Sequence, residues 1–414
     1  MLTSALLALA LAQTPQHRLF LQPNLPRVSY AFFEFAPASG AGMGTACACT
    51  TPTGAKGEAM TFTRAGDATC SKQGLATTGI ANGDLVVCTA NQPRVELSGG
   101  VLGLRVDPSA TNVCPRFIDY TNAAWVDVGT PTPTTGQTSP WTGTYATSAV
   151  QYDDNDGAAF EGRTQTVTVS AGAAYTMSCY VKAGTLTSAR LSLDGTTADF
   201  TGLSSTTWTL ASVTDASSSG VAIAAQILNG STAAGTGTVV WGGCQVEAGA
   251  TVTAMQPTVA AAAGRSADAP TVSLGSGTWG CEAASFSVAG YNASGSNQRV
   301  LTLAVDASNL YDQYINFSGA SLQHFTFLAA TTRQHTTSNA PAVARSVSRA
   351  VYRQSGTTLV TELDGTTTSS TPSAYTALTG AATLHLGKYT GAGFELSGII
   401  SRVQVDPSPT RCTP

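Results

Sequence analysis

The sequence predicts an all-β protein in which an N-terminal strand-rich segment precedes two antiparallel β-sandwich domains. Only 11% of the 414 residues are charged, and Thr, Ser, Ala and Gly dominate the chain. This composition disfavours helices and favours strands and tight turns. Short stretches of alternating polar and apolar residues recur at intervals of about ten residues, with Gly, Ser, Asp or Asn between them, which is typical of β-sandwiches. The length exceeds that of one small domain.

The clearest alternating stretch covers residues 164–184 and predicts two strands joined by a short connection at residues 170–172. In the second strand, side chains alternate between two faces. One face carries Tyr175, Met177, Cys179 and Val181, and the other carries Thr176, Ser178, Tyr180 and Lys182. We expect the first face to join a hydrophobic core and the second to face solvent.

Residues 1–12 form a short apolar run that ends in Ala10-Leu11-Ala12, which matches the small-residue pattern of a signal-peptide cleavage site. No positive charge precedes the run, so an incorrectly assigned start and a buried first strand are the alternatives. The run is too short to cross a bilayer, and no other stretch approaches the ~20 apolar residues of a transmembrane helix.

Composition and turn signals divide the remaining chain into three parts. Residues 13–112 are the strand-rich segment. Residues 113–260 are the first sandwich, in which Asp194-Gly195 predicts the tip of a hairpin because this pair tolerates a positive φ. An Ala-rich stretch at 260–270 breaks the strand pattern and predicts a junction, and residues 271–414 are the second sandwich.

Short segments between residues 58 and 270 follow one another in a specific order. They are Phe62-Thr-Arg-Ala65, Asn91-Gln-Pro-Arg94, residues 102–112, Tyr120-Thr-Asn-Ala-Ala-Trp125, residues 169–175, residues 180–184, residues 240–249 and Gly264-Arg-Ser-Ala-Asp268. Together they resemble a large family of bacteriophage tail and head-associated structural proteins, although residues 109–112 lack the Arg that usually precedes Thr-Asn. The resemblance implies a jelly-roll module like the carbohydrate-binding modules of glycosidases.

The last part of the chain carries a second set of segments: Thr361-Glu-Leu-Asp-Gly365, Leu384-His-Leu-Gly387 and residues 396–405. This set resembles the end of laminin-G-like or concanavalin-like sandwiches, where an Asp-Gly hairpin and a final apolar strand recur. The resemblance implies a concanavalin-like fold for residues 271–414.

Nine cysteines are scattered through the chain, which suits disulfides formed in an oxidising compartment. We predict two disulfides, Cys179–Cys244 within the first sandwich and Cys281–Cys412 across the ends of the second. The odd count leaves one free thiol. The pairing of the others stays open: Cys47, Cys49, Cys70, Cys88 and Cys114. The alternative is that all nine are reduced, buried small side chains, as in a protein assembled in a cytosol.

Aromatic side chains are the best candidates for ligand binding, because sugars stack their apolar C–H faces on exposed rings. The candidates lie in or beside turns, or on an outward strand face: Trp125, Trp141, Tyr145, Tyr180 and Trp208. The alternative is that they are ordinary half-buried sheet aromatics, since large rings commonly fill cores.

An acidic stretch at residues 153–157 offers oxygen ligands that suit Ca²⁺. The candidate ligands are Asp153, Asp154 and Asp156, with Glu161 nearby. Their spacing misses the EF-hand register, so a solvated hairpin turn is the alternative. No other cofactor is expected.

These features favour a non-enzymatic glycan-binding or adhesion protein that is secreted or displayed on a cell surface. The alternatives are a virion component of a phage or prophage, in contact with other virion proteins, and a glycoside hydrolase or polysaccharide lyase. The enzyme hypothesis lacks a recognisable carboxylate pair, and the four histidines sit in no catalytic motif. The net charge of −4 and the absence of a basic stripe argue against nucleic acid as a partner. A homo-oligomer is compatible with either leading hypothesis.

Overall fold

The computed structural model describes residues 32–34, 47, 49, 59–72, 78–98, 101–279, 281–288, 298–316, 321–328, 331–336, 348–355, 358–364, 366–370, 378–388, 396 and 398–406. Their regular structure consists of strands and one short 3-10 helix, η1 (Gly143–Tyr145). The predicted all-β fold class is therefore confirmed. Within these residues, no helix has the length and apolar character needed to span a membrane. The predicted signal peptide at residues 1–12 lies outside the described residues.

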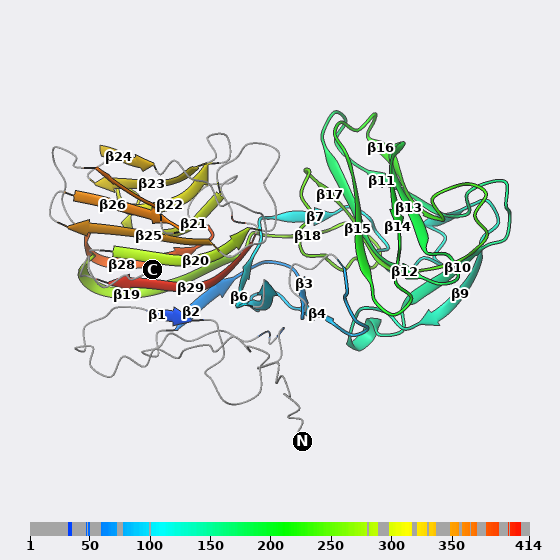
Figure 1. The fold of residues 1–414 in the computed structure, drawn as a ribbon, viewed down its shortest axis with the longest axis horizontal. Coiled ribbons are helices and arrows are strands. Elements are labelled where there is room, and N and C mark those ends of the chain that lie inside the picture. Colours follow the sequence, from blue (N-terminus) through cyan, green and yellow to red (C-terminus); the bar gives the residue numbers. More distant parts are fainter. Residues whose placement is uncertain are drawn as a thin grey trace, which may run out of the picture.

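The first sandwich consists of two five-stranded antiparallel sheets, seen on the right of Figure 1. The strand order is β15-β12-β17-β10-β9 in one sheet, which we call the junction-side sheet, and β14-β13-β16-β11-β8 in the other, the outer sheet. The strands are β8 (Trp125–Val128), β9 (Thr132–Gln137), β10 (Ala149–Asp154), β11 (Gly162–Thr168), β12 (Tyr175–Ala183), β13 (Ser188–Leu193), β14 (Thr196–Thr201), β15 (Thr209–Asp215), β16 (Ala222–Asn229) and β17 (Gly237–Ala248).

The core of the first sandwich lies between these two sheets. Met177, Val181 and Val246 from the junction-side sheet pack against Leu191 and Ile227 from the outer sheet, and all five are fully buried. Removal of this apolar surface from water is the main force that holds the two sheets together.

The second sandwich, on the left of Figure 1, also has two antiparallel sheets. One has the order β27-β26-β25-β20-β29-β6-β5, with β1 also paired to β29, and the other has the order β2-β19-β28-β21-β22-β23-β24. The strands are β1 (Phe32–Glu34), β2 (Met60–Thr63), β5 (Arg94–Ser98), β6 (Val101–Val106), β19 (Ala269–Trp279), β20 (Cys281–Val288), β21 (Gln298–Asp306), β22 (Asn309–Asn316), β23 (Ser321–Leu328), β24 (Thr331–Thr336), β25 (Ser348–Ser355), β26 (Thr358–Leu363), β27 (Thr366–Ser370), β28 (Leu378–Leu386) and β29 (Gly398–Asp406).

Strands of the N-terminal segment complete the second sandwich, although the whole first sandwich separates them in the sequence. β2 pairs with β19, and β6 pairs with β29. Met60, Phe62, Leu104 and Val106 enter the core of the second sandwich. Strands β1, β2, β5 and β6 of the segment predicted at residues 13–112 are thus divided between the two sheets of the second sandwich.

Two short pairs of strands connect the sandwiches. β3 (Ala68–Ser71) pairs with β4 (Leu85–Cys88), and β7 (Ala110–Asn112) pairs with β18 (Ala263–Arg265). Figure 1 shows both pairs between the two larger units. The junction expected at residues 260–270 therefore contains a strand, and this strand is paired with the end of the N-terminal segment.

The stretch at residues 164–184 forms two strands, but these strands are not a hairpin. β11 lies in the outer sheet and β12 lies in the junction-side sheet, so the connection crosses from one sheet to the other. Ser218, in the loop before β16, holds this connection in place. Its hydroxyl donates a hydrogen bond to the carbonyl of Ser170, and its carbonyl accepts one from the N–H of Gly172. The sequence signal for two strands was correct, while the short connection gave no information about which sheet each strand joins.

The Asp-Gly turn predicted in the first sandwich is present between β13 and β14. Asp194 and Gly195 both have positive φ values, 50° and 86°, as a two-residue hairpin loop requires. The equivalent turn between β26 and β27 places Asp364 at a φ of 49°.

Three disulfides are present in the described residues. Cys179 and Cys244 lie directly opposite each other on β12 and β17 and are joined, with 4.1 Å between their Cα atoms, which is the pair expected from the sequence. The other two tie the N-terminal segment: Cys47–Cys70 and Cys49–Cys88. Cys114 is a buried free thiol. The expected Cys281–Cys412 pair cannot be placed, since Cys412 lies outside the described residues. The three disulfides are consistent with an extracytoplasmic location.

Replacing both Cys179 and Cys244 by Ala should destabilise the first sandwich. The disulfide closes a loop with a sequence separation of 65, so its loss should lower the free energy of unfolding by about 4 kcal/mol in the chain-entropy view. Urea denaturation followed by tryptophan fluorescence measures this difference. Cys114→Ala is the control, because it removes a buried thiol without removing a cross-link. A double variant no less stable than the control would contradict the prediction.

Candidate functional site: a buried arginine–carboxylate network and an open sheet face

Four of the five aromatic side chains nominated for ligand binding are buried. The exposed fractions are 1% for Trp125, 1% for Trp141, 0% for Trp208 and 6% for Tyr180. Tyr145 is half-buried, and its ring packs edge-on against Trp141 with 6.2 Å between ring centroids. The expectation that these rings present exposed faces is therefore wrong for Trp125, Trp141, Trp208 and Tyr180.

The N-terminal segment covers most of these rings. Ile80 forms a backbone bridge with Trp208, and Leu85 forms one with Trp141. Ile80 and Leu85 share one apolar cluster with Trp141, Trp208 and Tyr180 on the outward face of the junction-side sheet. The aromatic rings at this face thus hold the N-terminal segment against the first sandwich.

The outward face of β12 is also buried, contrary to the expectation that it meets solvent. Thr176 and Ser178 have exposed fractions of only 2% and 1%. Thr176 donates a hydrogen bond to the carbonyl of Gly249, at 2.7 Å. Alternation correctly separated the two faces of the strand but did not show that a second layer covers the polar face.

Each buried indole N–H has an acceptor within the protein. The bonds are Trp125 to the carbonyl of Arg116 at 2.8 Å, Trp141 to the carbonyl of Gly242 at 2.6 Å, and Trp208 to Oδ1 of Asn82 at 2.8 Å. A sequence signal for this burial was available in Gly242-Gly243, within an otherwise apolar strand. A Cβ at Gly242 would lie 2.8 Å from the Trp208 ring, and strand glycines often mark such close approach.

The acidic stretch forms a hydrogen-bonded turn. Asp154 is 1% exposed, and its Oδ2 accepts a bond from the backbone N–H of Glu161 at 3.3 Å. Glu161 in turn accepts bonds from the N–H of Asn155 and from Thr130, each at 2.8 Å. No group of three or more His, Cys, Asp or Glu side chains is placed to hold a metal ion in the described parts of the chain. Asp153, Asp154 and Asp156 therefore do not converge as the calcium hypothesis requires.

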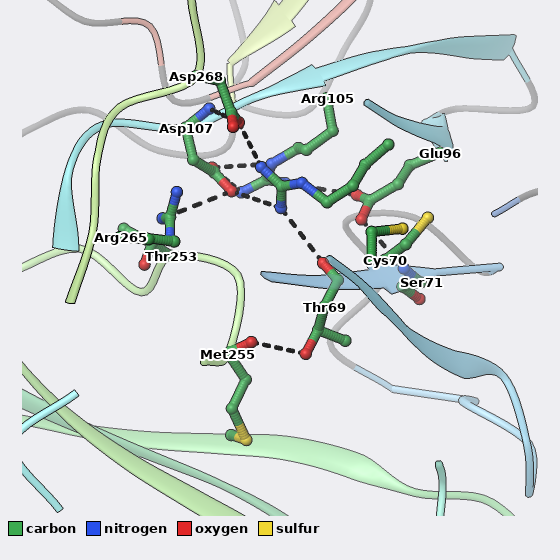
Figure 2. A network of polar contacts seen from close by, with 12 residues as sticks. Thr69, Cys70, Ser71, Glu96, Arg105, Asp107, Thr253, Met255, Arg265 and Asp268 are labelled. Carbon is green, nitrogen blue, oxygen red and sulfur yellow. Dashed lines mark hydrogen bonds and ion pairs between the residues drawn. The ribbon is translucent and has the colours of Figure 1, made fainter. Parts of the chain in front are cut away.

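The most concentrated polar chemistry lies at the junction of the two sandwiches (Figure 2). Its centre is Asp268, which is fully buried just before β19. One carboxylate oxygen of Asp268 pairs with Arg64, with a distance of 3.3 Å, and the other accepts bonds from Arg94 and from the backbone N–H of Asp107 at 2.9 Å. Asp268, just before β19, thus links this strand to the ends of β2 and β6 and to β5, which come from the N-terminal segment.

A second carboxylate, Asp107, extends the network. Nη1 of Arg94 lies 2.9 Å from its Oδ2, and Nε of Arg105 donates to its Oδ1 at 2.8 Å. Arg105 also lies 3.7 Å from Glu96, which accepts a bond from the N–H of Ser71 at 3.0 Å. Arginine–carboxylate pairs with such matched geometry are the strongest polar contacts available to side chains.

The electrostatics of the network differ from one group to the next. Burial raises the pKa of the Asp107 carboxyl, but Arg105 and Arg94 outweigh this effect and hold it far below its usual range. Burial lowers the pKa of Arg94, but Asp268 and Asp107 outweigh this effect and raise it. The pKa of Arg265 is lowered, because burial and the charge of Arg94 exceed the opposing influence of Asp107. Arg265 is therefore the least compensated of these three charges.

Glu247 connects the network to the first sandwich. It is the last residue but one of β17, is 1% exposed, and accepts bonds from the N–H and hydroxyl of Thr253 at 2.8 and 2.6 Å. Gln245 donates a third bond at 2.8 Å. Burial raises the pKa of Glu247 to about 7, against the opposing effects of Thr253, Arg265 and Gln245. Its carboxyl group therefore changes charge near neutral pH.

The charged segments that carried the resemblance to phage structural proteins meet in this network. Arg64, Arg94, Arg105 with Asp107, and Arg265 with Asp268 come from four separate segments of the sequence. The order of these segments in the sequence did not predict that their charges converge. These segments, far apart in the sequence, therefore meet at the junction of the two sandwiches.

The outward face of the outer sheet is open to solvent. Val126 on β8 is 59% exposed. Thr166 and Thr168 on β11 and Ala222 on β16 are also exposed, and Gln226 is half-buried. This face offers hydroxyl and amide groups around an apolar patch, and the aromatic search of the sequence did not find it.

One aromatic ring lies beside this face. The guanidinium of Arg190 sits 4.4 Å from the centroid of the Phe160 ring and makes two bonds to Asp199, at 2.6 and 2.8 Å. Arg190 is on β13 and Asp199 is opposite it on β14. The stacked pair provides a flat surface with fixed polar groups at the edge of the sheet.

No family model and no curated protein matches the chain. Solved structures that are similar to parts of it include the following three. A carbohydrate-binding module, CBM66 from Bacillus subtilis, has 13% identity and a TM-score of 0.26, with 33% of this chain and 81% of that chain covered. Domains LG4-5 of the mouse laminin α1 chain have 11% identity and a TM-score of 0.25, with 60% and 87% covered.

The tandem CBM22-1-CBM22-2 domain of Paenibacillus barcinonensis Xyn10C has 10% identity and a TM-score of 0.26, with 73% of this chain and 99% of that chain covered. At these TM-scores the similarities carry no functional argument.

Asp268→Ala should destabilise the protein severely, because it leaves Arg64 and Arg94 buried without their shared counter-charge. Breaking a buried ion pair by removing one partner costs about 3–5 kcal/mol. Asp199→Ala is the matched control, since its pair with Arg190 is partly exposed and such pairs contribute roughly 1 kcal/mol or less. Urea denaturation compares the two, and equal losses would count against the central role of Asp268.

Glu247→Gln should change how stability depends on pH. The pKa of Glu247 in the folded protein, about 7, lies above the ordinary value of 4.5. The stabilisation from proton binding is therefore complete below about pH 4.5 and is lost as the pH rises to about 7. Relative to wild type, the Gln variant should gain stability as the pH rises from 5 to 8, by up to roughly 3 kcal/mol.

Gln suits this position because its amide can accept the bonds from Thr253 N–H and Gln245 and donate to the Thr253 hydroxyl. The difference between variant and wild type isolates Glu247 from other titrating groups such as His385, whose pKa is lowered by burial. A difference in unfolding free energy that stays constant from pH 5 to pH 8 would refute the assignment.

Proposed function

We propose that this chain is a non-enzymatic glycan-binding protein of an extracytoplasmic compartment. The proposed binding surface is the outward face of the outer sheet, with its exposed Thr166, Thr168 and Val126 and its neighbouring Phe160–Arg190 pair. The observation that carries the proposal is the contrast between the two faces of the first sandwich. The N-terminal segment covers the face of the junction-side sheet, whereas the opposite face is open.

The chemistry of this face suits a sugar. Hydroxyl and amide side chains can exchange hydrogen bonds with sugar hydroxyls, and an aromatic ring or an apolar patch can take the C–H face of the sugar ring. Thr164 on β11 lies opposite Val126 on one side and Gln226 on the other, so these three side chains form a row across three strands. A row of this kind suits an extended chain of sugars.

Three disulfides support an extracytoplasmic location and favour it over assembly within a reducing cytosol, as a phage component would require. The rigid junction supports an adhesive role, because it holds the binding face at a fixed position relative to the second sandwich. Virion membership is the alternative, and co-purification of the chain with phage particles would support it.

A glycan array tests the proposal. Wild-type protein should bind at least one polysaccharide, and Thr166→Arg should weaken binding tenfold or more, because the long charged side chain blocks the middle of the face. Ala307→Arg is the charge-matched control, since Ala307 is exposed in the turn between β21 and β22 of the other sandwich, and it should bind as wild type does.

Two outcomes would overturn the proposal. Binding to no glycan would remove the ligand class, and equal losses in both Arg variants would remove the assigned face. Release of reducing sugar from a bound polysaccharide by the wild-type protein would replace the binding proposal with the hydrolase.

A further inference from the structure

Arg265 is a buried guanidinium with incomplete partners. It ends β18, opposite Ala110 on β7, and its side chain is 0% exposed. Its Nε, Nη1 and Nη2 atoms make no hydrogen bond. The nearest opposite charge is Oδ2 of Asp107, 3.7 Å from Nη2, which is too far for a hydrogen bond. Figure 2 shows this long contact at one end of the network.

The other arginines of the network are better satisfied. Arg64 donates to the carbonyls of Gly66, Cys88 and Thr89 as well as to Asp268. Arg94 and Arg105 each make close contacts with a carboxylate. The two carboxylate oxygens of Asp107 are already engaged by these two arginines. The carboxylate nearest to Arg265, that of Asp107, is therefore already paired with two other arginines.

The ion-paired groups of the network carry one more positive charge than negative charges. Four arginines face three carboxylates, those of Glu96, Asp107 and Asp268. The fourth acid, Glu247, directs its oxygens to Thr253 and Gln245, and it is partly protonated at neutral pH. An unpaired buried charge is costly, so buried charges are found paired or bound to ions.

We propose that the unpartnered donors of Arg265 bind a small inorganic anion at the junction, with chloride as the physiological occupant. The planar guanidinium presents several N–H donors toward one acceptor, and a monatomic anion can accept them from a single position. Complete burial of Arg265 favours a compact anion over a phosphate or sulfate. A water molecule could satisfy the donors but would leave the charge uncompensated.

The anion and the proton on Glu247 should bind cooperatively. Arg265 is the charged group that acts on Glu247, whose other contacts are with the neutral Thr253 and Gln245. A protonated Glu247 leaves the charge of Arg265 without an opposing acid on that side, so the anion should bind more tightly at pH 6 than at pH 8. Water in the same place would show no such linkage.

Thermal unfolding of the full chain tests the site. Sodium chloride should raise the Tm of wild type above that in sodium gluconate at equal ionic strength, by about 3 °C or more at pH 6 and by less at pH 8. Arg265→Gln should remove the difference between the two salts. Arg116→Gln, which removes an equal charge from a partly exposed side chain outside both proposed sites, should keep it.

A second measurement holds even if Arg265→Gln does not fold. Crystals of the wild-type protein grown in sodium bromide should show an anomalous peak within about 3.5 Å of a guanidinium nitrogen of Arg265. A water molecule at that position, or a salt-independent Tm in wild type, would overturn the proposal. A bromide peak without any chloride effect on Tm would indicate an adventitious ion only and would also overturn it.

Discussion

The carboxylate of Asp268 holds the molecule together at the point where its parts meet. It contacts Arg64, Arg94 and the backbone of Asp107, which precede it by 204, 174 and 161 residues. The entire first sandwich lies between these contacts in the sequence. The attraction within a buried ion pair is largely offset by the cost of desolvating its charges. We therefore interpret this network as a set of contacts that specifies geometry and adds little net stability. It fixes how the N-terminal strands enter the second sandwich, and the hydrophobic cores supply the stability.

The N-terminal segment makes hinge motion between the sandwiches costly. Its strands β2, β5 and β6 are built into the second sandwich, while Ile80 and Leu85 pack on the aromatic face of the first. Thr69, on β3, donates through its N–H and hydroxyl to the carbonyl of Met255 at 3.0 and 2.6 Å (Figure 2). A rotation of one sandwich against the other would break all of these contacts together. Any ligand surfaces on the two units are therefore held at a fixed separation.

The sequence predicted local structure well and the assembly poorly. Strand alternation and the Asp-Gly turns gave the strands around residue 194 and the opposed cysteines of β12 and β17, because these features depend on neighbours in the chain or on directly paired strands. The burial of Tyr180 depends on Ile80 and Leu85, 100 and 95 residues earlier in the chain, and alternation cannot reveal such a second layer. The surroundings of Arg265 were missed for the same reason, since its nearest opposite charge, Asp107, lies 158 residues earlier in the sequence.

The same distinction explains why aromatic side chains were poor guides to the open face of the outer sheet. A tryptophan can serve a ligand or an interface equally well, because both require a flat apolar surface with one hydrogen-bond donor. In this protein the three indoles of the first sandwich that were nominated each donate to an acceptor within the chain, so their bonding capacity is used in folding. The open face instead carries small hydroxyl side chains that hold no contact between parts of the chain. A sheet face that remains polar and unused after assembly is the better indicator of a surface kept for a partner.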